Sequence, residues 1–135
     1  MIDLYDSNKQ HYLRKDYSGK VTIVNFWASW YPPCVEEIPS LNRLRKQMEN
    51  DNMELISINY AEDPARIHQF LKNVNVEFPV LMDATGEVAA QWKVYVYPST
   101  FVIDSNGKIR YGINAAIHWD SPEVNTKLRA LLPPK

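Results

Sequence analysis

The segment WYPPC (30–34) is the place where this chain could carry redox chemistry, because it holds the only cysteine in 135 residues. An apolar run precedes it and a helical pattern follows it, so Cys34 is expected near the start of a helix. This context suits two cysteines separated by two residues, but Tyr31 stands where the first would be. A phenol cannot form or exchange a disulfide, so a dithiol cycle is chemically impossible within this chain.

Length and composition fit an ordinary globular protein, with one domain expected over residues 1–135. Hydrophobic residues make up 45% and charged residues 23%, and the net charge is −1. Because no basic run stands out, nucleic acid is not expected as a partner. Residues 1–20 hold several charges and no apolar stretch, so neither a signal peptide nor a membrane-spanning segment is expected.

The elements that must position Cys34 alternate between strands and helices. Their order is β-α-β-α-β-α-β-β-α, which predicts an α/β fold with right-handed crossovers. The turn signal SNG (105–107) predicts a final hairpin, so the sheet is expected to be mixed but mostly parallel, with helices flanking it. Expected strands cover 20–27, 53–59, 78–82, 99–104 and 108–112, with a short strand or hairpin at 2–5 and 11–13, and expected helices cover 33–50 and 85–92 and begin at 63 and 121.

Five segments, in this order and spacing, are specific enough to carry a family resemblance. They are GKVTIVNFWASW (19–30), PPC (32–34), EEIPSL (36–41), FPVLMD (78–83) and YPSTFVID (97–104). The chain resembles thioredoxin-fold proteins of the TlpA/ResA type, which are extracytoplasmic thiol–disulfide oxidoreductases of bacteria. The resemblance implies a thioredoxin fold with a TlpA-type helix–strand–helix insertion around 63–92. It also implies a periplasmic or cell-envelope location, although without a signal peptide a trimmed or a cytoplasmic form stays open.

The resemblance also implies roles for single residues. Tyr31 occupies the position of the attacking cysteine, and Cys34 that of the resolving one. Glu37 matches an acidic residue that helps to handle the thiol proton in ResA-like members; the alternative is a solvated glutamate in the first helical turn. Pro98 matches a cis-proline that faces the cysteine pair, where the backbone at Tyr97 could pair with an extended peptide. The alternative for Pro98 is an ordinary turn proline.

Aromatic residues around these positions could form a binding rim. Trp30, Tyr31, Tyr95 and Tyr97 are the candidates, although half-buried packing explains them equally well and core packing is favoured for Trp30. The segment IHWD (117–120) is expected to be a surface loop. The three histidines lack metal-ligand spacing with the cysteine, so no metal or other cofactor is expected.

Three function classes remain open. The family-level function is thiol–disulfide oxidoreductase, with the activity of this chain expected to be lost or reduced to the single thiol of Cys34. The alternative is a non-catalytic peptide-binding or chaperone-like module that uses a groove beside Pro98. A third possibility is an oxidoreductase in an altered form, with a cysteine replaced at Tyr31.

Expected partners are protein or peptide thiol and disulfide clients, or an extended peptide, bound by a monomer. A peroxiredoxin-type peroxidase is not favoured, because its motif needs a proline at Trp27 and a threonine at Tyr31.

Overall fold

The alternation of strands and helices is present in the computed structural model, which describes residues 2–13 and 19–133. The predicted elements all occur, and most of their ends agree within a few residues. The strands in the described residues are β1 (Asp3–Asp6), β2 (His11–Leu13), β3 (Val21–Trp27), β4 (Met53–Tyr60), β5 (Val80–Asp83), β6 (Ser99–Ile103) and β7 (Ile109–Ile113). The helices are α1 (Pro32–Gln47), α2 (Pro64–Asn73), α3 (Glu87–Gln91) and α4 (Pro122–Arg129).

The strands form one mixed sheet in the order β2-β1-β5-β4-β3-β6-β7. The prediction of a mostly parallel sheet is wrong: only β3/β4 and β4/β5 pair in parallel among the described strands, and β6 runs antiparallel to β3. A helix of five residues is about 7 Å long, whereas a five-residue strand is about 17 Å long. Helix α3 is therefore too short to carry the chain back along the sheet, and β6 starts at the edge where β5 ended.

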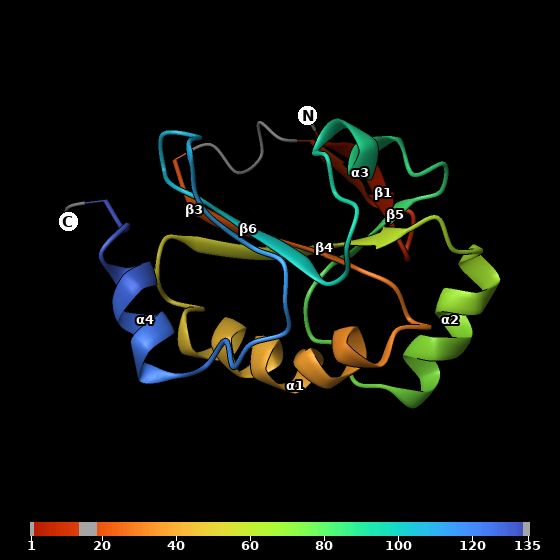
Figure 1. Cartoon of the computed structure of the whole chain (residues 1–135), viewed down its shortest axis with the longest axis horizontal. Coiled ribbons are helices and arrows are strands. Elements are labelled where there is room, and N and C mark those ends of the chain that lie inside the picture. The colour runs from red at the N-terminus through yellow and green to blue at the C-terminus, as the bar shows by residue number, and fades with distance from the viewer. Residues whose placement is uncertain (1, 14–18, 134–135) are drawn as a thin grey trace.

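Helices cover both faces of this sheet (Figure 1), with α1, α2 and α4 on one side and α3 on the other. Successive side chains of a strand point to opposite faces, and every residue of β3 is buried. Ile23 and Trp27 belong to the core under α1, whereas Val24 and Phe26 belong to the core under α3. By this alternation Asn25 faces α1, which brings a buried amide to the helix that carries Cys34.

Side-chain caps start two of the helices, as the sequence predicts. The Asp63 carboxylate accepts a hydrogen bond from the backbone N–H of Ala65 at 2.9 Å, and the Ser121 hydroxyl accepts one from Val124 at 3.3 Å. Helix α1 begins differently, because Tyr31 at its N-cap makes no side-chain cap and two prolines follow. Prolines suit these first positions, where the backbone N–H has no partner within the helix.

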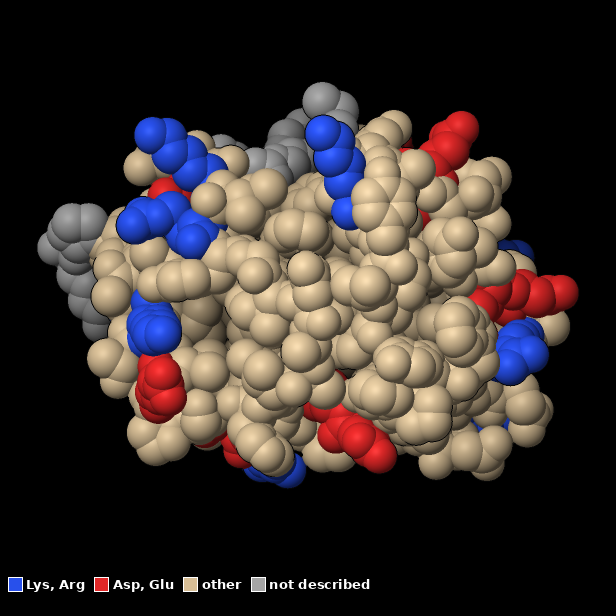
Figure 2. Space-filling view, in the orientation of Figure 1, with Lys and Arg blue, Asp and Glu red and all other residues tan. Residues whose placement is uncertain are grey.

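The surface of the face seen in Figure 2 is largely uncharged in its middle. Lysine, arginine, aspartate and glutamate side chains lie around its rim, with both signs interspersed. Among the described residues, no helix combines the length and the apolar character that crossing a bilayer requires.

Candidate functional site around Cys34

The site lies at the edge of the sheet where β3 ends and β6 begins. Phe26, next to the last residue of β3, pairs with Ser99, the first residue of β6. The turn that follows β3 and the segment that precedes β6 must therefore meet at this edge. The peptide bond between Tyr97 and Pro98 in the second segment is cis. The turn after β3 and the segment before β6 are about 70 residues apart in the sequence, and the pairing of β3 with β6 brings them together.

Cys34 lies in the first turn of α1, and its backbone N–H donates to the carbonyl oxygen of Tyr31 at 3.0 Å. Its side chain is only 2% exposed. The pKa of the Cys34 thiol is raised to about 11: burial is the main cause, a backbone hydrogen bond with Ala28 opposes it, and the nearby carboxylates of Glu37 and Glu62 add to it. At neutral pH the thiol is therefore protonated, which is the unreactive form.

Glu37 is the charged centre of a buried network next to Cys34, so the interpretation of a solvated glutamate is wrong. Its side chain is 3% exposed. One oxygen accepts from Nδ2 of Asn25 at 3.0 Å; the other accepts from the backbone N–H of Ile117 at 3.0 Å and from Nε1 of Trp119 at 2.7 Å. Burial raises the pKa of Glu37, and these three donors oppose the shift. The carboxylate thereby joins β3, α1 and the segment that precedes α4.

Trp119 corrects the prediction that residues 117–120 form a surface loop. Its side chain is 1% exposed and joins the core under α1. Its indole N–H binds Glu37, and its backbone N–H donates to the Ser40 hydroxyl at 3.2 Å. A buried indole N–H usually has a hydrogen-bond partner, and the sequence gives no direct sign that α1 supplies one 82 residues away.

Glu62 is a second buried carboxylate that sequence reasoning missed. It is 8% exposed and accepts from the backbone N–H of Ser29 at 2.8 Å and from Nδ2 of Asn59 at 2.6 Å. The Ser29 hydroxyl also donates to it, and Arg66 lies 3.2 Å away. Glu62 thus anchors the turn between β3 and α1. Its position just beyond the carboxyl end of the parallel strand β4 was the available signal, because side chains gather at that edge.

The aromatic candidates separate into exposed and inward-facing groups. Trp30 is 56% exposed, Tyr31 40% and Tyr95 79%, so the preference for core packing of Trp30 is wrong. The rings of Trp30 and Tyr31 contact each other at a tilt, with centroids 6.0 Å apart. Tyr97 is half-buried against Tyr60, and burial raises its pKa to about 12. The edge therefore presents exposed aromatic rings to solvent and keeps its single thiol inside.

This arrangement supplies one protonated thiol and two buried carboxylates. Both carboxylates oppose formation of a thiolate, which is the nucleophile in disulfide exchange. Among the described residues, no group of three or more histidine, cysteine, aspartate or glutamate side chains is placed to hold a metal ion.

Comparisons with known proteins agree with this fold. The model of a family described as "AhpC/TSA family" matches residues 2–112. Over 106 residues the chain is 32% identical to the thiol–disulfide oxidoreductase ResA of Bacillus subtilis, covering 78% of this chain and 59% of that protein. A ResA of Bacillus cereus is 34% identical over 95 residues, covering 70% of this chain and 55% of the relative. The chain thus spans a little over half the length of these curated relatives.

Solved structures show the same fold at lower identity. StoA of Bacillus subtilis superposes with a TM-score of 0.78 at 20% identity, covering 95% of this chain and 93% of that one. A secreted Mycobacterium tuberculosis disulfide oxidoreductase, homologous to DsbE of E. coli, gives a TM-score of 0.83 at 23% identity, with 96% of each chain covered. The chain therefore belongs to the AhpC/TSA family and has a thioredoxin-like fold.

Proposed function

We propose that this chain is a redox-inactive member of its family that binds extended peptides at the edge formed by residues 28–31 and 95–98. One observation carries the proposal: Tyr31 and Trp30 are exposed at the start of α1, whereas Cys34 is buried there. A site built for disulfide exchange exposes its attacking sulfur, and here an aromatic ring is exposed at that position. The dithiol cycle is lost because Tyr31 stands at the position of the attacking cysteine.

A monothiol function, in which Cys34 forms a mixed disulfide with a partner, is less well supported. Such a reaction needs a thiolate that can reach the sulfur of another molecule. Burial and two neighbouring carboxylates keep the pKa of Cys34 near 11, and its side chain is almost inaccessible. The same two properties argue against a peroxidase function, which also depends on a reactive thiolate.

The binding mode that we propose is the pairing of an extended peptide with the backbone that precedes Pro98. Tyr95 and Val96, at 79% and 50% exposure, lie at the surface just before Pro98, where the Val96 carbonyl accepts from the Ser99 hydroxyl at 2.6 Å, and Trp30 and Tyr31 supply exposed apolar surface at the same edge. Main-chain pairing gives little sequence preference, so affinity depends on the aromatic side chains. The partners are then protein or peptide clients, met as a monomer in the bacterial periplasm or cell envelope, where relatives of the TlpA/ResA type act.

An NMR titration with unfolded, cysteine-free peptides tests this binding mode. We expect chemical-shift changes confined to residues 29–35 and 95–99, and weaker binding by Trp30→Ala and by Tyr31→Ala. Tyr111→Ala is the matched control, because Tyr111 is an aromatic residue of similar exposure to Tyr31 that lies on β7. If no peptide perturbs these residues, and only a thiol-bearing ligand is retained through Cys34, the proposal fails and the monothiol function replaces it.

Insulin reduction with dithiothreitol tests the loss of the redox cycle. We expect no turnover above the reagent blank, because no dithiol can form. Tyr31→Cys should create an internal disulfide with Cys34 and restore turnover. Turnover by the unmodified chain would refute the proposal, as would a folded Tyr31→Cys variant that never oxidises internally.

A further inference from the structure

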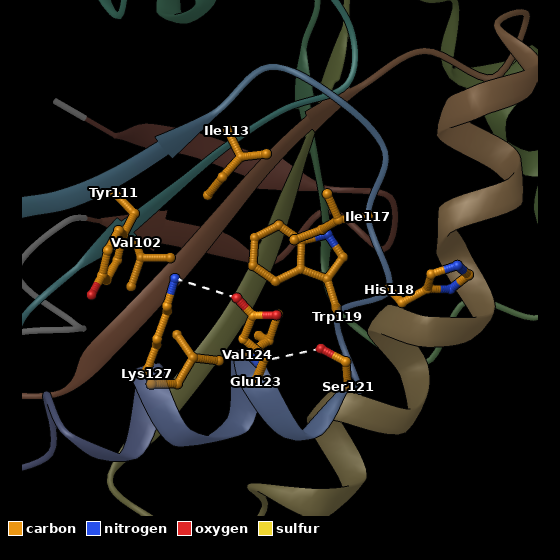
Figure 3. A pocket seen from close by; sticks show the side chains of 11 residues that line it. Val102, Tyr111, Ile113, Ile117, His118, Trp119, Ser121, Glu123, Val124 and Lys127 are labelled. Carbon is orange, nitrogen blue, oxygen red and sulfur yellow. Dashed lines mark hydrogen bonds and ion pairs between the residues drawn. The ribbon is translucent and has the colours of Figure 1, made fainter.

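A pocket that the proposed function does not use opens beside Trp119. It has a volume of about 450 Å³ and lies between the β6–β7 hairpin, residues 113–121 and α4. Figure 3 shows the side chains of these segments converging on the same hollow. Small-molecule sites usually have volumes of roughly 300 to 1,000 Å³, so this pocket has the size of a ligand site.

The inner wall of the pocket is apolar. Val102 of β6, Ile113 of β7, and Val124 and Leu128 of α4 contribute aliphatic surface, and Trp119 contributes its ring. Because the indole N–H of Trp119 is already bound to Glu37, the ring offers this pocket only carbon surface. A flat or branched apolar group would gain burial here without leaving a polar atom unpaired.

Of the described residues that line the pocket, Lys127 carries a cation that is only loosely paired. Lys127 Nζ lies 3.7 Å from Oε1 of Glu123, one turn earlier on α4, and the two side chains are 57% and 81% exposed. Figure 3 shows the ammonium group of Lys127 joined to Glu123 by a dashed line. Exposed ion pairs of this kind contribute little free energy, so an anionic ligand can take the place of the Glu123 carboxylate beside Lys127 at low cost. The neighbouring cations are committed elsewhere: Arg110 pairs with Asp104, and Arg129 with Asp51.

We propose that this pocket binds a small amphipathic anion. Its apolar body lies against Trp119 and Val124, and its carboxylate or sulfonate pairs with Lys127 at the mouth. An apolar cavity of ligand size with the loosely paired ammonium group of Lys127 at its mouth suits an apolar body that carries an anionic head. The site is separate from the peptide-binding edge and does not depend on the proposed function.

A fluorescence titration with 8-anilinonaphthalene-1-sulfonate tests the proposal, and the uncharged N-phenyl-1-naphthylamine isolates the contribution of the anion. We expect one saturable site for the sulfonate. Lys127→Met should weaken sulfonate binding about fivefold, because it removes the exposed charge pair between Lys127 and the sulfonate. The binding of the neutral probe should not change. Glu123→Gln should strengthen sulfonate binding, because it releases Lys127. Lys72→Met, in the last turn of α2, is the matched control and should change neither probe.

Localisation to the pocket is tested by Val124→Trp, which fills it and should abolish the binding of both probes. The fold of this variant is checked by circular dichroism, and the exposed Lys127→Met change provides a test that does not depend on core packing. Equal sulfonate affinity in the unmodified chain, Lys127→Met and Glu123→Gln would overturn the proposal. Probe binding that is lost in Trp30→Ala rather than in Val124→Trp would also overturn it.

Discussion

The reactivity of Cys34 offers the sharpest test of the buried site. At pH 7.5 a thiol with the Cys34 pKa of about 11 is ionised in roughly 0.03% of molecules, compared with about 9% for an ordinary thiol of pKa ~8.5. This lowers the reactive fraction about 300-fold, but the more basic thiolate is intrinsically about tenfold more nucleophilic. Alkylation in the folded state should therefore be slower by about 30-fold or more, since the 2% exposure of the side chain slows it further.

The assay measures iodoacetamide labelling by mass spectrometry in native buffer and in urea, from pH 7 to pH 10. If labelling occurs in the folded site, its rate should rise about tenfold per pH unit throughout this range, because the pKa lies above it. If labelling requires transient opening, the rate should level off above about pH 8.5. Native labelling as fast as in urea at pH 7.5 would refute the buried, protonated thiol. A rate that levels off near pH 8.5 and equals the rate in urea would refute the raised pKa, whereas a much slower rate that levels off there shows labelling through the opened state.

Further predictions concern the groups that surround this site. Glu37→Ala leaves the donors of Ile117 and Trp119 without an acceptor and should lower the free energy of unfolding by roughly 2–5 kcal/mol in urea titrations, whereas Glu37→Gln should cost much less. Burial raises the pKa of Glu37 in the folded chain, so in the unfolded chain this carboxyl ionises at lower pH, from about 4.3. The contribution of Glu37 to the free energy of unfolding therefore falls as pH rises from about 4.3 to the raised pKa. Glu37→Gln should remove that loss, and its stability relative to the unmodified chain should therefore improve between pH 4.5 and 7.5; an unchanged difference would contradict the raised pKa. Glu62→Ala should speed amide hydrogen exchange at residues 28–31, where it removes the acceptor of the Ser29 N–H, and unchanged exchange would show that the turn is held otherwise. Gly86→Ala should destabilise the chain by roughly 1–3 kcal/mol, because φ is +77° and the new Cβ would lie 2.8 Å from Cε1 of Tyr60; a thermal midpoint equal to that of the unmodified chain would exclude this strain.

Local sequence patterns were sufficient to predict the elements and the chemical limit of this protein. The apolar run 20–27, the caps at Asp63 and Ser121 and the turn at 105–107 depend on residues that are close together in the chain, so their physics is readable without a structure. The absence of a second thiol is a matter of composition alone. It excludes an internal dithiol cycle whatever the fold.

Tertiary structure decided the direction of β6 and the environment of the site. The antiparallel pairing of β6 with β3 depends on how far the short helix α3 can carry the chain, which periodicity does not reveal. Glu37 and its neighbour Glu36 are indistinguishable in a sequence pattern, but only Glu37 finds donors from Asn25 and from residues 117 and 119. Burial of a charge is tolerated where partners converge from distant segments. That convergence is a property of the folded chain, and so is the burial that is the main reason why the pKa of Cys34 is raised and its thiol stays protonated.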